Sequence, residues 1–160
     1  AVHRLEAGLR IGTLERARGL DDIETYRRFE ARADAHRDHL LDLMRRLKRE
    51  GKKVVGYGAS TKGNVLIQYC GIDSELVSCI AEVNEEKFGA FTPGSKIPIV
   101  SEAQARAMKP DYFLVFPWHF KAGILRREQE FLRSGGRFIF PLPSLEIVSA
   151  DGSETLWSAG

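Results

Sequence analysis

The sequence predicts an α/β fold in which a doubly wound parallel sheet of about five strands, in the order 3-2-1-4-5, follows a long helix. Apolar residues recur at helical spacing between residues 21 and 50. Strand-like and helix-like segments then alternate from residue 52 to residue 142, which is typical of parallel sheets with right-handed crossovers. The first of these strands runs directly into a glycine-rich turn, as the first strand of many doubly wound sheets does.

The first 50 residues are predicted to form an arm and a helix ahead of the sheet. Residues 1–20 mix charges with three glycines and show no sustained period, so we expect a connecting arm. Residues 21–50 are predicted to form a lead-in helix, because one face of that helix would be apolar. The residues on this face are Ile23, Tyr26, Phe29, Ala33, Leu40, Met44 and Leu47. His36 and His39 lie on the same helix without an identifiable acidic partner and are expected to be solvated.

Residues 51–148 are predicted to form the Rossmann-like domain itself. Runs rich in β-branched and aromatic residues, bounded by glycine or proline, predict the strands, and capping residues mark the helices between them. The expected strands are 52–57, 76–83, 97–100, 110–117 and 137–142, and the expected helices are 61–70, 102–108 and 120–133. The segment 149–160, SADGSETLWSAG, is expected to be a loosely held tail.

Composition limits the functions that this chain can have. At 160 residues and 43% hydrophobic, the chain is long enough for one compact domain with an appendage. Its 24 basic and 22 acidic residues are spread along the chain, so neither nucleic acid nor a membrane is an expected partner. Cys70 and Cys79 lack the spacing of a zinc site or a disulfide framework, so no metal site is expected and a reducing cytoplasm fits best. The chain starts at Ala1 rather than methionine, and we expect it to be a piece of a longer protein.

The glycine-rich turn lies in the stretch VVGYGASTKGN, residues 54–64. Gly56 permits a tight turn after the strand, Gly58 lets the backbone approach an anion, and the following helix offers free N–H groups. These features predict a phosphate or carboxylate site. The stretch is not a Walker loop, because Lys62 precedes the last glycine and Asn64 follows it. It also departs from G-x-G-x-x-G, since Thr61 stands where the third glycine belongs, and close packing between strand and helix is the alternative explanation for the glycines.

Three more residues are expected at the same crevice. Glu82 lies near the end of the second strand, 24 residues after Gly58, where dinucleotide sites place a carboxylate that binds a ribose. Trp118 and His119 directly follow the fourth strand and should face the glycine turn, offering an aromatic surface and a group able to donate to phosphate or to move a proton. His119 is therefore the catalytic candidate. The alternatives are a solvated glutamate, a tryptophan that packs at the rim and a histidine without a role.

Four stretches of this sequence resemble the C-terminal domain of sugar C-methyltransferases that act on nucleotide-linked deoxysugars. They are GKKVVGYGASTKGNVLIQYCGI, EVNEEKFGAFTPGSKIPIV, KPDYFLVFPWHF and GGRFIFPLP. The likeness covers about residues 20–145, and the combination of GYGAxxKGN, PGxxIPI and GGxFIxPxP is specific.

The resemblance implies a Rossmann-like domain that helps to form a sugar-nucleotide site beside two further domains of the same chain. In that family one further domain binds zinc and the other binds S-adenosylmethionine, so both cofactors would lie outside these 160 residues. Trp118 falls on the family's tryptophan after strand four, and the glycine-rich motif falls on Gly56, Tyr57, Gly58, Ala59, Lys62, Gly63 and Asn64. The chain departs from the family at Glu82 and His119, where aspartate and asparagine are usual, and at KAGI, which lacks a usual glutamate.

Three functions follow as hypotheses. The leading one is the sugar-nucleotide-binding domain of an S-adenosylmethionine-dependent C-methyltransferase, which would seat a nucleotide-linked keto-deoxysugar and be catalytic only with its neighbouring domains. The alternatives are a self-contained nucleotide- or nucleotide-sugar-binding module, and a structural domain whose site has decayed. The candidate substrate-binding residues are Gly56, Tyr57, Gly58, Ala59, Ser60, Thr61, Lys62, Gly63, Asn64, Glu82, Trp118 and His119.

Overall fold

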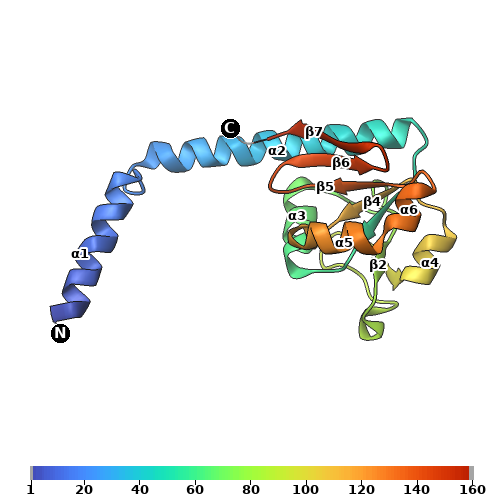
Figure 1. Cartoon of the computed structure of the whole chain (residues 1–160), viewed down its shortest axis with the longest axis horizontal. Coiled ribbons are helices and arrows are strands. Elements are labelled where there is room, and N and C mark those ends of the chain that lie inside the picture. The colour runs from blue at the N-terminus through green and yellow to red at the C-terminus, as the bar shows by residue number, and fades with distance from the viewer. Residues whose placement is uncertain (1, 159–160) are drawn as a thin grey trace. The chain divides into compact units, whose positions relative to one another are not determined.

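The computed structural model describes residues 2–158, and their side chains from residue 10 onward. It divides into two compact units, Ala1–Ala35 and His36–Gly160. The first unit holds helix α1 (Val2–Ala17) and the start of helix α2 (Ile23–Arg49) (Figure 1). Where the sequence predicted an arm without regular structure, α1 is helical. The segment is rich in leucine, alanine, glutamate and arginine, which favour a helix even without an apolar face.

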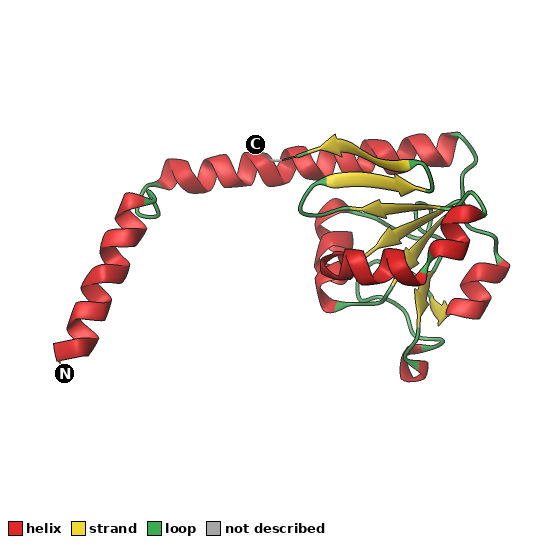
Figure 2. Ribbon diagram, in the orientation of Figure 1, coloured by secondary structure: helices red, strands yellow, loops and turns green. Residues whose placement is uncertain are grey.

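A seven-stranded sheet forms the centre of the second unit, with the strand order β3-β2-β1-β4-β5-β6-β7 (Figure 2). The first five strands pair in parallel, so the predicted order 3-2-1-4-5 is confirmed. Two further strands extend the sheet by antiparallel pairing. The strands are β1 (Val54–Tyr57), β2 (Ile80–Glu82), β3 (Ile99–Ser101), β4 (Tyr112–Val115), β5 (Arg137–Phe140), β6 (Leu145–Ser149) and β7 (Gly152–Trp157).

Helices lie between the parallel strands, as expected for crossover connections. They are α3 (Thr61–Cys70), α4 (Glu102–Ala107), α5 (Lys121–Arg127), α6 (Gln129–Arg133) and the short 3₁₀ helices η1 (Glu85–Lys87) and η2 (Trp118–Phe120). The single helix expected over 120–133 is divided at Glu128, whose backbone leaves the helical conformation. The buried Glu128 side chain contacts residues of α4 and β1, and these contacts accompany the break.

The sheet separates two apolar clusters, because neighbouring residues of a strand point to opposite faces. Val54 of β1 belongs to the cluster that includes α2 and α3, whereas Val55 and Tyr57 belong to the cluster on the side of α4, α5 and α6. Phe116, the residue after β4, is fully buried on the side of the sheet that α3 covers. The alternation therefore decides which residues of the glycine motif meet which layer of helices.

The C-terminal half of α2 belongs to the second unit, which begins at His36 rather than at residue 51. Its core residues are Leu40, Leu43, Met44 and Leu47, all buried. His36, expected to be solvated, is buried instead: its Nε2 atom hydrogen-bonds the carbonyl of Pro141, and its ring meets the Trp157 ring edge-on at 5.2 Å. Spacing along the chain does not indicate these contacts, because both partners are more than 100 residues away.

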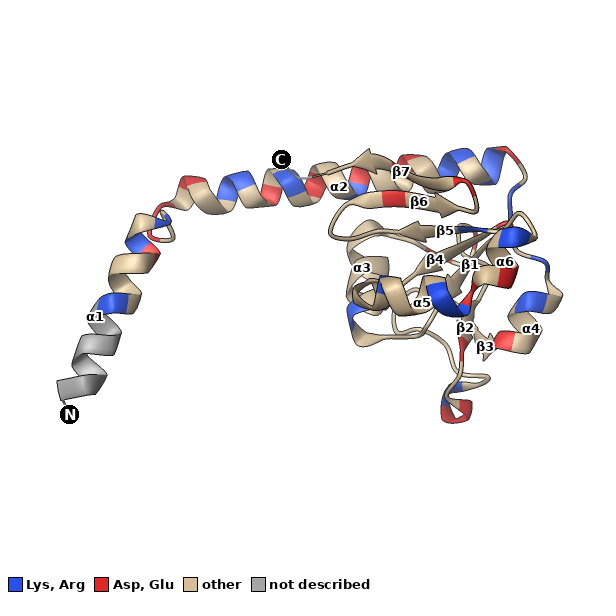
Figure 3. Ribbon diagram, in the orientation of Figure 1, with Lys and Arg blue, Asp and Glu red and all other residues tan. Residues whose placement is uncertain are grey.

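The C-terminal segment also differs from the prediction of a loose tail. Residues 152–157 form β7, which pairs antiparallel with β6 from Ser149↔Gly152 to Leu145↔Trp157. The connection between the two strands is short, so this pairing is local. In β6 itself, Leu145, Ile147 and Val148 are buried. Within residues 2–158, no helix is long and apolar enough to cross a bilayer. Figure 3 shows basic and acidic residues interspersed along the described part of α2, as the spread of charge in the sequence indicated.

Candidate functional site

The glycine turn connects β1 to α3 at the carboxyl edge of the parallel strands. Gly58 has a backbone φ of +79°, and a Cβ atom added there would lie 2.9 Å from Cδ of Pro117. Its amide donates to the carbonyl of Ala81 at 2.8 Å. Both the left-handed backbone and the contact with Pro117 therefore require glycine at this position.

The other two glycines of the motif serve packing. A Cβ atom at Gly56 would lie 2.6 Å from the ring of Phe116, and one at Gly63 would lie closer still to the same side chain. Phe116 fills the space between β1 and α3 that these two glycines leave. The packing explanation is thus sufficient for Gly56 and Gly63, and only Gly58 shapes the turn itself.

The first turn of α3 presents backbone N–H groups at this edge. The hydroxyl of Ser60 caps the helix by accepting from the amide of Gly63 at 3.0 Å, and the amide of Asn64 donates to the carbonyl of Ser60. Among the described residues, no acceptor is found for the amides of Thr61 and Lys62. Such N–H groups, together with the positive end of the helix dipole, suit an anion.

Glu82 holds the turn from the end of β2. One carboxylate oxygen accepts from the amide of Ala59 at 2.9 Å and from Nζ of Lys87 at 3.3 Å, and the other accepts from the amides of Val83 and Asn84. Burial by itself would raise the pKa of this carboxyl, but the hydrogen bonds outweigh it and hold the pKa below its ordinary value. Because both oxygens are occupied, Glu82 positions the turn, and the contact with a ribose stays a prediction.

Two cavities flank the turn. The first, called the loop cavity, has a volume of about 410 Å³ and is lined by Tyr57, Gly58 and Glu82 among others. The second, called the α3 cavity, has about 310 Å³ and is lined by Asn64 and Phe116 among others. The residues that line both are Ala59, Ser60, Thr61 and Lys87. The turn therefore forms the wall between two spaces of the size that small ligands occupy.

Asn64 is the one predicted site residue with an unused buried atom. Its Oδ1 atom is inaccessible to solvent and has no hydrogen-bond partner among the described residues. Buried polar atoms in folded proteins are nearly always paired. Asn64 also lines the α3 cavity, but this oxygen itself is closed off from solvent.

Five of the predicted site residues line neither cavity: the packing glycines Gly56 and Gly63, and three residues with side chains, Lys62, Trp118 and His119. Lys62 is exposed on α3, and Trp118 and His119 lie in η2, where His119 is exposed and its ring lies 6.3 Å from the Trp118 ring. None of the three lines the loop cavity or the α3 cavity. The cation that does line both is Lys87, which also donates to the carbonyl of Ala59 at 2.9 Å. The sequence offered no signal for Lys87, because η1 places it through the loop after β2.

A cluster of charged residues surrounds the buried Glu128 on the other face of β1. The Tyr57 hydroxyl donates to Glu128 at 3.0 Å, and Arg106 donates to both oxygens of Glu128 at 2.8 and 2.7 Å. Burial raises the pKa of the Tyr57 hydroxyl well above its ordinary value, and the Glu128 carboxylate raises it further. Tyr57 is therefore a hydrogen-bond donor at neutral pH rather than a base.

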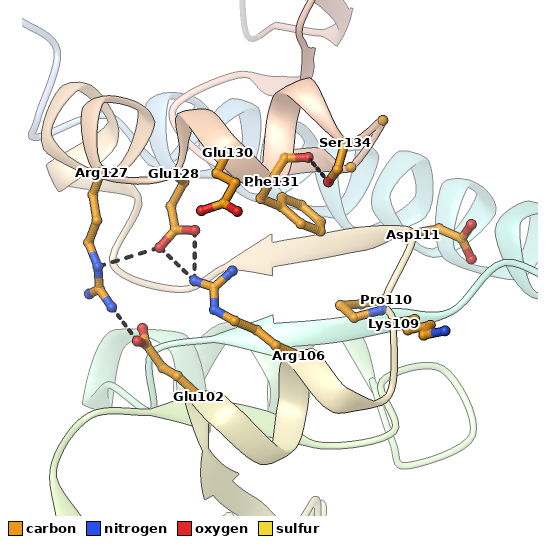
Figure 4. Close-up of a pocket in the computed structure, with 12 residues that line it drawn as sticks. Glu102, Arg106, Lys109, Pro110, Asp111, Arg127, Glu128, Glu130, Phe131 and Ser134 are labelled. Carbon is orange, nitrogen blue, oxygen red and sulfur yellow. Dashed lines mark hydrogen bonds and ion pairs between the residues drawn. The ribbon is translucent and has the colours of Figure 1, made fainter.

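This cluster borders a third space, called the α4–α6 cavity, of about 690 Å³. Figure 4 shows Arg106 and Arg127 extending toward Glu128 from opposite sides, with Glu102 below Arg127. Arg127 pairs with Glu102, and its Nε atom lies 3.5 Å from Glu128. The sequence did not indicate Glu102, Arg106, Arg127 or Glu128, because these residues come from separate elements and form no motif.

The cysteines and acidic residues provide no metal centre in the described part of the chain. No group of three or more histidine, cysteine, aspartate or glutamate side chains there is arranged to hold a metal ion. Cys70 and Cys79 are both buried and unbridged, and burial raises the pKa of the Cys70 thiol to about 11. Thiols in such surroundings are inert packing groups.

Comparison with known proteins finds the same family along most of the chain. Residues 7–143 match the family described as the C-methyltransferase C-terminal domain. The C-methyltransferase NovU of Streptomyces niveus is 39% identical over 139 residues, a stretch that covers 87% of this chain. The chain spans about a third (33%) of the length of that relative.

Proposed function

Because the chain belongs to the family of C-methyltransferase C-terminal domains, we propose that it is the sugar-nucleotide-binding domain of a larger S-adenosylmethionine-dependent enzyme. In that enzyme it seats a nucleotide-linked keto-deoxysugar for methyl transfer to a sugar carbon. The observation that supports this most is the glycine turn, where the amides of Thr61 and Lys62 have no acceptor among the described residues and two cavities meet.

The diphosphate is the part of such a ligand that the turn suits best. Gly58 has no side chain, so the backbone beside the loop cavity is accessible to a ligand. The amides of Thr61 and Lys62 are hydrogen-bond donors at the positive end of a ten-residue helix. Donors and dipole together favour two adjoining phosphates. The α3 cavity gives the remainder of the nucleotide a neighbouring space, and Asn64 is one of the polar residues that line it.

The methyl donor is placed outside this chain. The described residues form one glycine turn at the edge of one parallel sheet, and the Glu82 carboxylate that would bind a donor ribose is filled by protein N–H groups and Lys87. We therefore infer that a sugar nucleotide and S-adenosylmethionine do not bind together at this edge. When bound, S-adenosylmethionine supplies the methyl group, and we place it on the remaining two thirds of a protein like the relative.

We also propose that the base that removes a sugar proton lies outside this chain. Such a base must lie within hydrogen-bond reach of the proton it abstracts. His119 is exposed and lines neither cavity beside the glycine turn, and Tyr57 is a hydrogen-bond donor held by Glu128. The residues of this chain thus bind and orient the substrate.

The proposal is tested by titration calorimetry of the whole chain with a panel of nucleoside diphosphates and nucleotide-sugars. We expect heat of binding for at least one of them and loss of that binding in Gly58→Ala, whose added methyl group would meet Pro117 beside the turn. Gly89→Ala is the matched control, because Gly89 has the same φ of +79° and open space around a Cβ atom.

Two results would contradict the proposal. Absence of heat with every ligand would favour a structural domain with a decayed site. Equal loss of binding in Gly58→Ala and Gly89→Ala would show that the effect comes from strained backbone and not from the turn.

A further inference from the structure

Two of the three cavities meet at a single ion pair. The loop cavity and the α4–α6 cavity share only Glu102 and Arg127 among their lining residues. Arg127 comes from the end of α5 and pairs with Glu102 at the start of α4, as Figure 4 shows. The pair is therefore the partition between the two cavities.

The charged side chains that line the loop cavity balance one another. Lys87 and Arg127 are the two cations of the lining, and Glu82 and Glu102 are the two acids. Each cation is paired with one of the acids. A diphosphate brings negative charge into this neutral setting, so at least one cation has to turn from its carboxylate toward the ligand.

Lys87 is the cation that is harder to release. It donates both to the carbonyl of Ala59 and to Glu82, whose side chain is only 8% exposed. Removing Lys87 from this position would break two hydrogen bonds at once, one to the Ala59 carbonyl of the turn and one to Glu82. Lys87 is thus bound into the wall of the loop cavity.

Arg127 is held less firmly. Its side chain is 51% exposed, and an exposed ion pair contributes little to stability. Glu128, its second partner at 3.5 Å, keeps two hydrogen bonds from Arg106 and one from Tyr57 when Arg127 leaves. Glu102 is itself partly exposed and can be solvated. The departure of Arg127 therefore strands no buried charge.

We infer that Arg127 exchanges Glu102 for a phosphate of the ligand in the loop cavity, so that Glu102 is an internal competitor of that phosphate. The inference rests on the proposed function and names Arg127 as a specificity-determining residue for it. The planar guanidinium group matches the geometry of phosphate oxygens. Opening of the ion pair also joins the loop cavity to the α4–α6 cavity.

The test measures dissociation constants by titration calorimetry with two probes, inorganic pyrophosphate and thymidine diphosphate. Glu102→Gln, which removes the competitor, should bind both probes about three- to fivefold more tightly, the size of a part-exposed ion pair. Arg127→Ala should bind about tenfold more weakly or worse, as expected for the loss of a charged hydrogen bond. The double variant should bind both probes as weakly as Arg127→Ala does, because without Arg127 there is no cation for which Glu102 competes with the phosphate.

Glu130→Gln is the matched control for charge. Glu130 is exposed and lines the α4–α6 cavity but not the loop cavity, so its variant should bind like the wild type. Glu102→Asp, which keeps the charge at the start of α4 but shortens its reach, serves as the second variant should Glu102→Gln unfold, and an intermediate gain is expected.

Unchanged or weaker binding in both Glu102 variants overturns the inference. So does a gain in the double variant over Arg127→Ala. The proposed function stands in these cases as long as the wild type binds thymidine diphosphate and Gly58→Ala does not. If the wild type binds neither probe, the inference fails, and the proposed function fails with it only if no other nucleotide of the panel binds.

Discussion

At the scale of single residues, the carboxylate of Glu82 holds the glycine turn in place. Glu82 gathers the amides of Ala59, Val83 and Asn84 on two oxygens. A glutamine in its place would keep one acceptor atom and lose the charge. The turn is therefore held by an interaction whose strength depends on pH.

Glu82→Gln should lower the free energy of unfolding at pH 7 by roughly 1.5–3 kcal/mol, the range for hydrogen bonds to charged groups. The folded pKa of Glu82 lies below its ordinary value, so the carboxylate stabilises the fold above the ordinary pKa of about 4.3. That contribution is lost as the pH falls through the folded pKa. The difference between wild type and variant should therefore shrink below about pH 4.

Urea unfolding between neutral and acidic pH measures this, with Glu86→Gln at an exposed position of η1 as the control. If the difference in unfolding free energy between Glu82→Gln and the wild type stayed constant down to acidic pH, the role assigned to the charge would be wrong.

Lys62 gives a second prediction at this scale. The sequence placed it in the phosphate site, whereas the structure leaves its side chain exposed and outside both cavities of the turn. Lys62→Ala should therefore change the affinity for a nucleoside diphosphate less than about twofold, even at low salt where exposed charges are least screened. Calorimetry at low and physiological salt checks this, and a tenfold loss that vanishes with added salt would restore the contact expected from the sequence.

At the scale of elements, two helices of the domain begin in the same way and differ in what they face. Ser60 caps α3 beside the glycine turn, and Ser101 caps α4 through a capping box with Gln104. Both hydroxyls satisfy a backbone amide of the first turn. Only the cap of α3 shapes the amides proposed to bind phosphate.

Ser60→Ala and Ser101→Ala should each lower the free energy of unfolding by about 1 kcal/mol, the usual cost of losing an N-cap. Ser60→Ala should also weaken binding of a nucleoside diphosphate, because the first turn of α3 loses its fixed geometry. Thermal unfolding and calorimetry on the pair separate the two effects. Equal affinities of the two variants would show that the start of α3 does not contact the ligand.

At the scale of the whole molecule, we predict that this chain alone transfers no methyl group. Its described residues form one glycine turn, and neither His119 nor Tyr57 is placed to act as a base beside it, whereas carbon methylation needs a donor, an acceptor and a base held together. Incubation of the chain with labelled S-adenosylmethionine and a nucleotide-linked keto-deoxysugar measures this. Label in the sugar above a control without protein would contradict the prediction and make the domain an enzyme by itself.

The parallel part of the fold was predictable because its signals are local. Strand and helix periods, the caps at Ser60 and Ser101, and the glycine turn are each encoded within a few neighbouring residues. The same is true of Gly58, whose position after a strand marks the turn. Local signals also misled: residues 149–160 contain few apolar residues, yet β7 forms because β6 offers it a paired edge.

The sequence by itself determined the order of the five parallel strands, the glycine turn and the family to which the chain belongs. Only the tertiary structure decided which side chains meet there. Tyr57 and Glu128 are 71 residues apart, and His36 and Pro141 are 105 apart. Local backbone preferences lie in adjacent residues, but contacts of this kind arise only when packed elements bring distant side chains together, which no spacing in the sequence records.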